Sequence, residues 1–183
     1  MPVVTLPNGT TKSFEGPVTI ADVAASIGPG LAKAAVAGVV DGESLDMAMP
    51  IEKDADLRLL TAKDAEGIDI IRHSFAHLVG HAVKQLYPDA QMAIGPVIKD
   101  GFYYDIAYEK PFTPEDLEAI EQRMKELIAK DYEVNVEVVN RNQAKQAFAS
   151  REEPYKLEIV EEIPDGETIN NILDSIALAS SML

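Results

Sequence analysis

Short runs of alternating hydrophobic and polar residues fill residues 1–62, and turn-forming pairs separate them. The stretch VVTLPNGTTKSF predicts two strands joined at Asn8-Gly9, and AAVAGVVDGESLD predicts a second hairpin at Asp41-Gly42. The stretch ADLRLLT predicts a last strand. With one helix between the hairpins, this order of elements is typical of a β-grasp, ubiquitin-like module.

The helix of this module is predicted from TIADVAASIG, where apolar residues recur at helical spacing. Thr19 or Asp22 can cap its start, and Gly28 can end it. Gly28 and Gly30 in IGPGLAK predict a loop after the helix. This loop lacks the GxxxxGK pattern and follows a helix, so it does not indicate a phosphate-binding loop.

A polar joint, TAKDAEG, follows at 61–67 and indicates a domain boundary. A long helix is predicted from about Glu66 to Tyr87, stopped by Pro88. Its expected buried stripe consists of Ile68, Ile71, Phe75, Leu78, Val79, Ala82 and Leu86.

The remainder predicts alternating strands and helices. MAIGPVIKDGFYYDI indicates a strand, a turn at Asp100-Gly101 and a second strand, and YEVNVEVV and YKLEIVEEIP each indicate a strand. Thr113 and Pro114 begin a helix that ends near Asp131, and NRNQAKQAFASR predicts a shorter helix. The expected apolar face of the first of these helices is Leu117, Ile120, Met124 and Leu127. Residues 63–168 therefore predict an α+β domain with helices on a mostly antiparallel sheet.

Composition and charge narrow the classes of function. The 183 residues include no cysteine, which excludes disulfides and thiolate chemistry and favours a cytoplasmic location. No apolar run is long enough to predict a membrane span, and MPVVTLPNGT does not read as a secretory signal. The net charge of −15 disfavours a broad nucleic-acid surface, so RNA contact would need a local basic patch or a partner domain.

Three histidines, His73, His77 and His81, lie in HSFAHLVGH at intervals of four. On a helix, His73 and His77 share one face and can converge on one ligand, whereas His81 is turned about 80° from His73 and is expected to be structural. The pair is compatible with zinc ligation, but a metal needs at least a third ligand. A metal-free general base, a hydrogen-bond donor, or two partly buried structural histidines are the alternatives.

Two further stretches can carry chemistry. In GFYYD, alternation can place Phe102 and Tyr104 in the core, or a tyrosine hydroxyl and Asp105 can line a cleft beside the histidine helix. Lys156, expected on a strand, can be solvated or can bind a phosphate or carboxylate.

Several of these stretches together resemble the N-terminal region of bacterial threonyl-tRNA synthetases. They are DVAASIGPGLAKAAVAGVVDGE, IIRHSFAHLVGHAVKQLYPDAQMAIGPVIKDGFYYD and REEPYKLEI. The resemblance runs from residue 1 to about residue 168. It implies a TGS domain, a β-grasp fold, over 1–62 and an editing domain over 63–168 that hydrolyses serine mischarged on tRNA(Thr). Editing is needed because a methyl-sized difference gives only about 1–3 kcal/mol of discrimination.

The resemblance also assigns residues and partners. His73 and His77 match the family's HxxxH pair and are expected to be catalytic, while Tyr104 and Lys156 match positions that line the editing site and bind substrate. Related alanyl editing domains hold zinc, with His73 and His77 in the matching positions, but the threonyl domain works without an essential metal, so no cofactor is expected in this chain. The implied partners are tRNA(Thr), in the context of the full enzyme, and seryl-adenosine-type ligands, with no membrane. The ATP and zinc sites belong to the family's separate catalytic domain.

The resemblance ends after EIPDGET. The family continues with an Asp-Met-Cys-Arg-Gly-Pro-His segment that returns to the two histidines, whereas this sequence reads INNILDSIALASSML. Residues 169–183 are therefore a divergent tail, predicted as a short apolar helix, and half of the editing site is expected to be missing. Truncation of the family pattern, a change of reading frame, or divergence into another role are the open explanations. Three functions stay open: a weakened editing module, a non-catalytic tRNA- or partner-binding module, and a metal-dependent hydrolase that uses His73 and His77.

Overall fold

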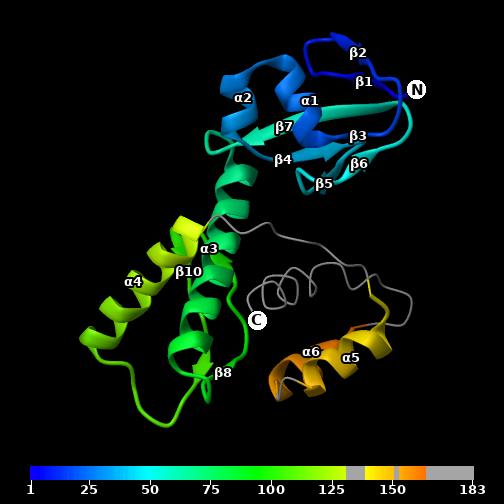
Figure 1. Cartoon of the computed structure of the whole chain (residues 1–183). Coiled ribbons are helices and arrows are strands. Elements are labelled where there is room, and N and C mark those ends of the chain that lie inside the picture. The colour runs from blue at the N-terminus through cyan, green and yellow to red at the C-terminus, as the bar shows by residue number, and fades with distance from the viewer. Residues whose placement is uncertain (131–138, 151–152, 164–183) are drawn as a thin grey trace. The chain divides into compact units, whose positions relative to one another are not determined.

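The computed structural model describes residues 1–130, 139–150 and 153–163 (Figure 1). The chain divides into two compact units, Met1–Arg72 and His73–Leu183. The division falls inside one long helix, ten residues after the predicted boundary at 62/63, which stays a prediction. None of the helices within the described ranges is both long and apolar enough to cross a membrane.

The first unit is built on a five-stranded sheet, which confirms the predicted β-grasp (Figure 1). Its strand order is β2-β1-β7-β4-β5, with β1 and β7 parallel and the other neighbours antiparallel. A smaller pair, β3 with β6, completes the unit. The strands are β1 Val3–Thr5, β2 Thr11–Ser13, β3 Val18–Thr19, β4 Ala35–Val40, β5 Glu43–Leu45, β6 Pro50–Ile51 and β7 Ala55–Thr61.

Both predicted hairpins are confirmed by the β1–β2 and β4–β5 pairings. In the second, Asp41 and Gly42 have φ angles of 51° and 93°. Positive φ at both central residues matches the twist of the flanking strands, which is why Asp-Gly pairs favour two-residue hairpins.

Helix α1, Ile20–Ile27, begins and ends where the sequence predicts. Thr19 Oγ1 accepts a hydrogen bond from Asp22 N at 3.1 Å, and the Asp22 carboxylate accepts one from Thr19 N at 3.3 Å, which together form a capping box. The buried face of α1 packs into a core with β1 and β7. The predicted loop after Gly28 is wrong, because Pro29–Ala34 form a short helix, α2. Proline suits its first turn, and the leucine, alanine and lysine that follow are good helix formers.

Helix α3, Ala65–Leu86, confirms the long helix. At its start the Asp64 carboxylate accepts hydrogen bonds from Thr61 N and Thr61 Oγ1, at 2.8 and 2.9 Å. At its end Lys84 Nζ donates to the carbonyls of Pro88 and Ala90. These contacts hold the chain that precedes and follows the helix against its two ends.

The predicted buried stripe of α3 is partly wrong. Phe75 and Leu86 are 44% and 39% exposed, whereas Ala82 and Val83 are fully buried. The hydrophobic cluster of the second unit gathers around the middle of α3, and Phe75 lies one turn before it. At the other end of the helix Tyr87 packs against the cluster in place of Leu86.

Helix α4, Pro114–Lys130, lies beside α3 and supplies the buried residues Ile120 and Leu127 (Figure 1). Thr113 caps it, as predicted, through a hydrogen bond of 3.3 Å from Asp116 N to Thr113 Oγ1. Leu117 was expected on the apolar face but is 58% exposed, since it lies in the first turn outside the cluster.

Two short antiparallel ladders replace the single long hairpin expected over 92–106. Strands β8 Gln91–Met92 and β11 Ile106–Ala107 form one, and β9 Val97–Ile98 and β10 Gly101–Phe102 form the other. Between the ladders, Asp105 N donates to Ile94 O at 2.8 Å and Ala93 N donates to Asp105 O at 3.0 Å. Residues 93–96 are therefore held against 103–105.

Helices α5, Arg141–Ser150, and α6, Pro154–Glu162, pack side by side around Ala144, Phe148 and Val160 (Figure 1). The first confirms a prediction. The second corrects one, because YKLEIVEEIP is not a strand. Pro154 suits a first helical turn. The helical conformation also places Val160 against Phe148 of α5. The strand predicted from YEVNVEVV and the tail at 169–183 lie outside the described residues, except for Val139.

Candidate functional site

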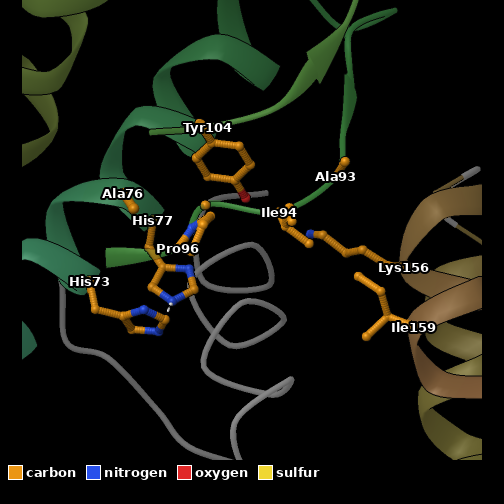
Figure 2. Close-up of a pocket in the computed structure, with 10 residues that line it drawn as sticks. His73, Ala76, His77, Ala93, Ile94, Pro96, Tyr104, Lys156 and Ile159 are labelled. Carbon is orange, nitrogen blue, oxygen red and sulfur yellow. Dashed lines mark hydrogen bonds between the residues drawn. The ribbon is translucent and has the colours of Figure 1, made fainter. Parts of the chain in front are cut away.

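A pocket of about 330 Å³ lies within the second unit (Figure 2). It is bordered by α3, by the 93–96 segment, by Tyr104 and by α6. All four predicted site residues line it, and His81 does not. The lining consists of His73, Ala76, His77, Ala93, Ile94, Gly95, Pro96, Tyr104, Lys156 and Ile159.

His73 and His77 meet through their ring nitrogens (Figure 2). The two Nε2 atoms are 2.8 Å apart, and the ring planes cross at 86° with centroids 4.4 Å apart. A hydrogen bond between two imidazole nitrogens needs one donor and one acceptor. In the neutral pair, one ring therefore carries its proton on Nε2 and the other on Nδ1.

Burial lowers the pKa of His77 to about 4, helped by the charges of His73, Lys156 and His81. At neutral pH His77 is therefore uncharged. An uncharged imidazole can accept a hydrogen bond from water or a hydroxyl group, which a protonated one cannot.

We expect the chain to lose stability as the pH falls from about 6.5 to about 4. In that window the unfolded chain protonates His77 and the folded chain does not, so protons favour unfolding. The expected loss is at most roughly 3 kcal/mol, at about 1.4 kcal/mol per pKa unit. Urea unfolding at several pH values should show a shallower pH dependence for His77→Gln than for the native chain. Equal slopes in the two proteins would contradict the expectation.

Tyr104 lies between two glycines, one on α3 and one in the 93–96 segment. A Cβ added at Gly95 would lie 2.8 Å from Tyr104 Cδ2, whereas one at Gly80 would lie 3.5 Å from Tyr104 Cε2. Burial, followed by the charge of Glu153, raises the pKa of Tyr104, so its hydroxyl is protonated at neutral pH and can donate a hydrogen bond. Tyr103 is 49% exposed, and neither Tyr103 nor Asp105 lines the pocket. Of the residues in GFYYD that could have lined a cleft, Tyr104 is therefore the one that does so.

The same substitution at these two glycines should have opposite effects. Gly95→Ala forces the Tyr104 ring to move and is expected to destabilise the folded chain by about 1–3 kcal/mol. Gly80→Ala meets the ring at ordinary contact distance and should stabilise the chain by about 0.5–1 kcal/mol, because alanine favours a helix. Urea unfolding of both variants measures the difference, and a loss of stability for Gly80→Ala equal to that for Gly95→Ala would refute the steric argument.

Lys156 reaches the pocket from α6, and not from a strand as predicted (Figure 2). Its Nζ lies 2.7 Å from Glu153 Oε2 and 5.5 Å from the centroid of the Phe148 ring. The side chains of Lys156 and Glu153 are only 14% and 7% exposed. Sequence reasoning missed Glu153, although its position before Pro154 and three residues before Lys156 could have indicated a contact within one helical turn.

The described residues do not bring a third metal ligand to His73 and His77. The Nε2 atoms of His73 and His77 are engaged with each other, and within the described ranges no group of three or more His, Cys, Asp or Glu side chains could hold a metal ion. The pocket combines an apolar lining with two imidazoles, one hydroxyl and one ammonium group. This arrangement is typical of a site that orients a small polar ligand.

Comparison with known proteins supports the architecture. The TGS domain family model matches residues 1–61. The threonine–tRNA ligase of Prochlorococcus marinus (strain MIT 9211) is 62% identical over 169 residues, which cover 92% of this chain and 26% of that protein. The chain thus spans about a quarter of the length of this curated relative. It contains a TGS domain and is related to part of threonine–tRNA ligase over nearly all of its own sequence.

Proposed function

We propose that the second unit is an editing module that hydrolyses the ester bond between serine and tRNA(Thr). The observation that carries the proposal is the single pocket lined by His73, His77, Tyr104 and Lys156. These residues come from α3, from the chain before β11 and from α6, far apart in the sequence. Relatedness to a threonine–tRNA ligase supplies the class of substrate.

In the proposed reaction, water attacks the carbonyl carbon of the seryl ester and the bond to the ribose oxygen breaks. The proton lost by the water ends on the ribose oxygen, giving free serine and tRNA. His73 and His77 hold the attacking water or the neighbouring 2′-hydroxyl group, because the low pKa of His77 keeps it an acceptor at neutral pH. Tyr104 donates a hydrogen bond to the aminoacyl-adenosine, and Lys156 binds its phosphate side.

The size of the pocket supports a small part of the tRNA as the bound group. About 330 Å³ is near the lower end for ligand sites and suits an aminoacyl ester with part of the terminal nucleoside. Such a site can exclude threonine because of its extra methyl group. A synthesis pocket has to accept threonine, and it can use the same methyl group to reject serine by only about 1–3 kcal/mol.

The family's Cys- and His-containing segment has no counterpart in these 183 residues, which contain no cysteine and no histidine after His81. We therefore propose that half of the family's editing site is missing here and that hydrolysis is slower than in a chain that carries the segment. The tRNA is proposed as the partner in the context of the longer enzyme. The net charge of −15 makes tight tRNA binding by these residues alone unfavourable.

Deacylation of purified seryl-tRNA(Thr) tests the proposal. With the chain in excess over the tRNA, serine release should exceed the rate in buffer, and threonyl-tRNA(Thr) should be hydrolysed at the buffer rate. A chelator should leave the rate of serine release unchanged. A fall to the buffer rate in the presence of the chelator would favour the metal-dependent alternative. No acceleration of serine release, or equal acceleration for both esters, would overturn the proposal.

A further inference from the structure

Glu153 is a charged residue buried within the described part of the chain. Its side chain is 7% exposed, and it is the one buried polar or charged residue among the positions that the structure describes. It precedes the first residue of α6 but makes no side-chain hydrogen bond that caps the helix. Moving a carboxylate out of water costs several kcal/mol unless a partner compensates the charge. The location therefore calls for a reason other than helix capping.

The compensating partner is Lys156, in the first turn of α6. The ammonium nitrogen lies 2.7 Å from Glu153 Oε2, and the Phe148 ring of α5 lies on another side of it at 5.5 Å. A carboxylate and an aromatic face both attract a cation. A free lysine side chain has about 2 kcal/mol of rotamer entropy to lose when it binds a ligand. Here much of that freedom is already lost before any ligand arrives.

We propose that Glu153 is a positioning residue that holds the Lys156 ammonium group at the pocket in the orientation that receives substrate. The identity of the substrate in this inference rests on the proposed function, whereas the geometry of the Glu153–Lys156 pair does not. Its consequence is that the pair should matter for substrate affinity more than for the chemical step, because His73 and His77 are held by α3 independently of α6.

The first test compares Glu153 with Glu161, a glutamate on α6. Glu153→Gln should raise KM for seryl-tRNA(Thr) by about tenfold, one pair interaction of roughly 1.4 kcal/mol, with kcat changed less than about threefold. Glu161→Gln is the matched control, since Glu161 pairs with Lys145 of α5 at 3.1 Å but is 64% exposed and does not line the pocket. Glu153→Asp keeps the charge and should recover part of the affinity. A KM unchanged in folded Glu153→Gln would overturn the inference.

A second test does not depend on activity. Reductive methylation followed by mass spectrometry reports how accessible and reactive each lysine is. Lys156 should react about tenfold faster in Glu153→Gln than in the native chain, while the rate of Lys145 changes only in Glu161→Gln. If Glu153→Gln does not fold, Glu153→Asp serves instead, with an expected rise of about threefold. Unchanged Lys156 reactivity overturns the positioning role, whereas absent hydrolysis by the native chain overturns only the proposed function.

Discussion

Replacing His77 with alanine is expected to slow seryl-tRNA(Thr) hydrolysis by at least about 100-fold, the usual effect of losing a positioned acid–base group. The pKa of His77, about 4, keeps its ring a hydrogen-bond acceptor at neutral pH. Its Nε2 atom is hydrogen-bonded to Nε2 of His73. His73→Ala should cost about as much, because either change leaves the remaining ring without its partner. Single-turnover deacylation measures both.

The double variant distinguishes a coupled pair from two independent groups. If the rings act as a unit, the loss in the double variant should be close to that of either single variant and not the product of the two. His81→Ala provides the control, since His81 lies on the same helix but does not line the pocket. A comparable loss in that control would show that the helix, and not the pair, was disturbed.

Replacing Phe148 with alanine is expected to destabilise the second unit by about 3–5 kcal/mol. The ring is fully buried, at the centre of the cluster that joins α5 to α6. It also faces the Lys156 ammonium group, so the variant should bind a 5′-phosphorylated seryl-adenosine analogue with an amide in place of the ester more weakly. Urea unfolding followed by circular dichroism gives the stability, and calorimetric titration gives the affinity.

Phe75→Ala is the matched control for this change. Phe75 was predicted to be buried but is 44% exposed, so its loss should cost less than about 1 kcal/mol. A cost as large as that of Phe148→Ala would indicate that Phe75 is buried, as the sequence predicted. Comparing the two variants thus tests the structure at Phe75, where the observed exposure differs from the burial that helical periodicity predicts.

Elements with strong local determinants were predicted well. Asn8-Gly9 and Asp41-Gly42 specify tight turns, and Thr19 and Thr113 each supply a side-chain oxygen for the first turn of a helix. These determinants act within four residues of the position they define. The β-grasp fold followed from their order along the chain.

Helix α6 was not predicted, because the stretch that forms most of it satisfies two periods at once. In YKLEIVEEIP apolar residues alternate as in a strand, and Val160 also lies at helical spacing from Lys156. The choice depends on packing against Phe148, which lies on another helix and is invisible to a local pattern. The same limit applies to the exposed Phe75 and Leu117, which lie outside the hydrophobic cluster of the second unit.

The candidate site shows the same division. His73 and His77 were found from their spacing alone, since a separation of four places two side chains on one helix face. A tyrosine of GFYYD and Lys156 were open alternatives from the residues alone, and the resemblance favoured a site role for Tyr104 and Lys156, because a lone tyrosine or lysine has no chemical pattern in sequence. Neither route identified Glu153, which its burial distinguishes from the other acidic residues within the described ranges.

The two glycines around Tyr104 also have a consequence for how sequences of this kind can diverge. The ring fills the space that a side chain at position 95 would otherwise occupy, and it limits position 80 to a small side chain. A smaller residue at 104 would open that space, and only then could position 95 accept a larger side chain without displacement. The three positions should therefore drift together among related sequences, with the strongest statistical covariation expected between 95 and 104.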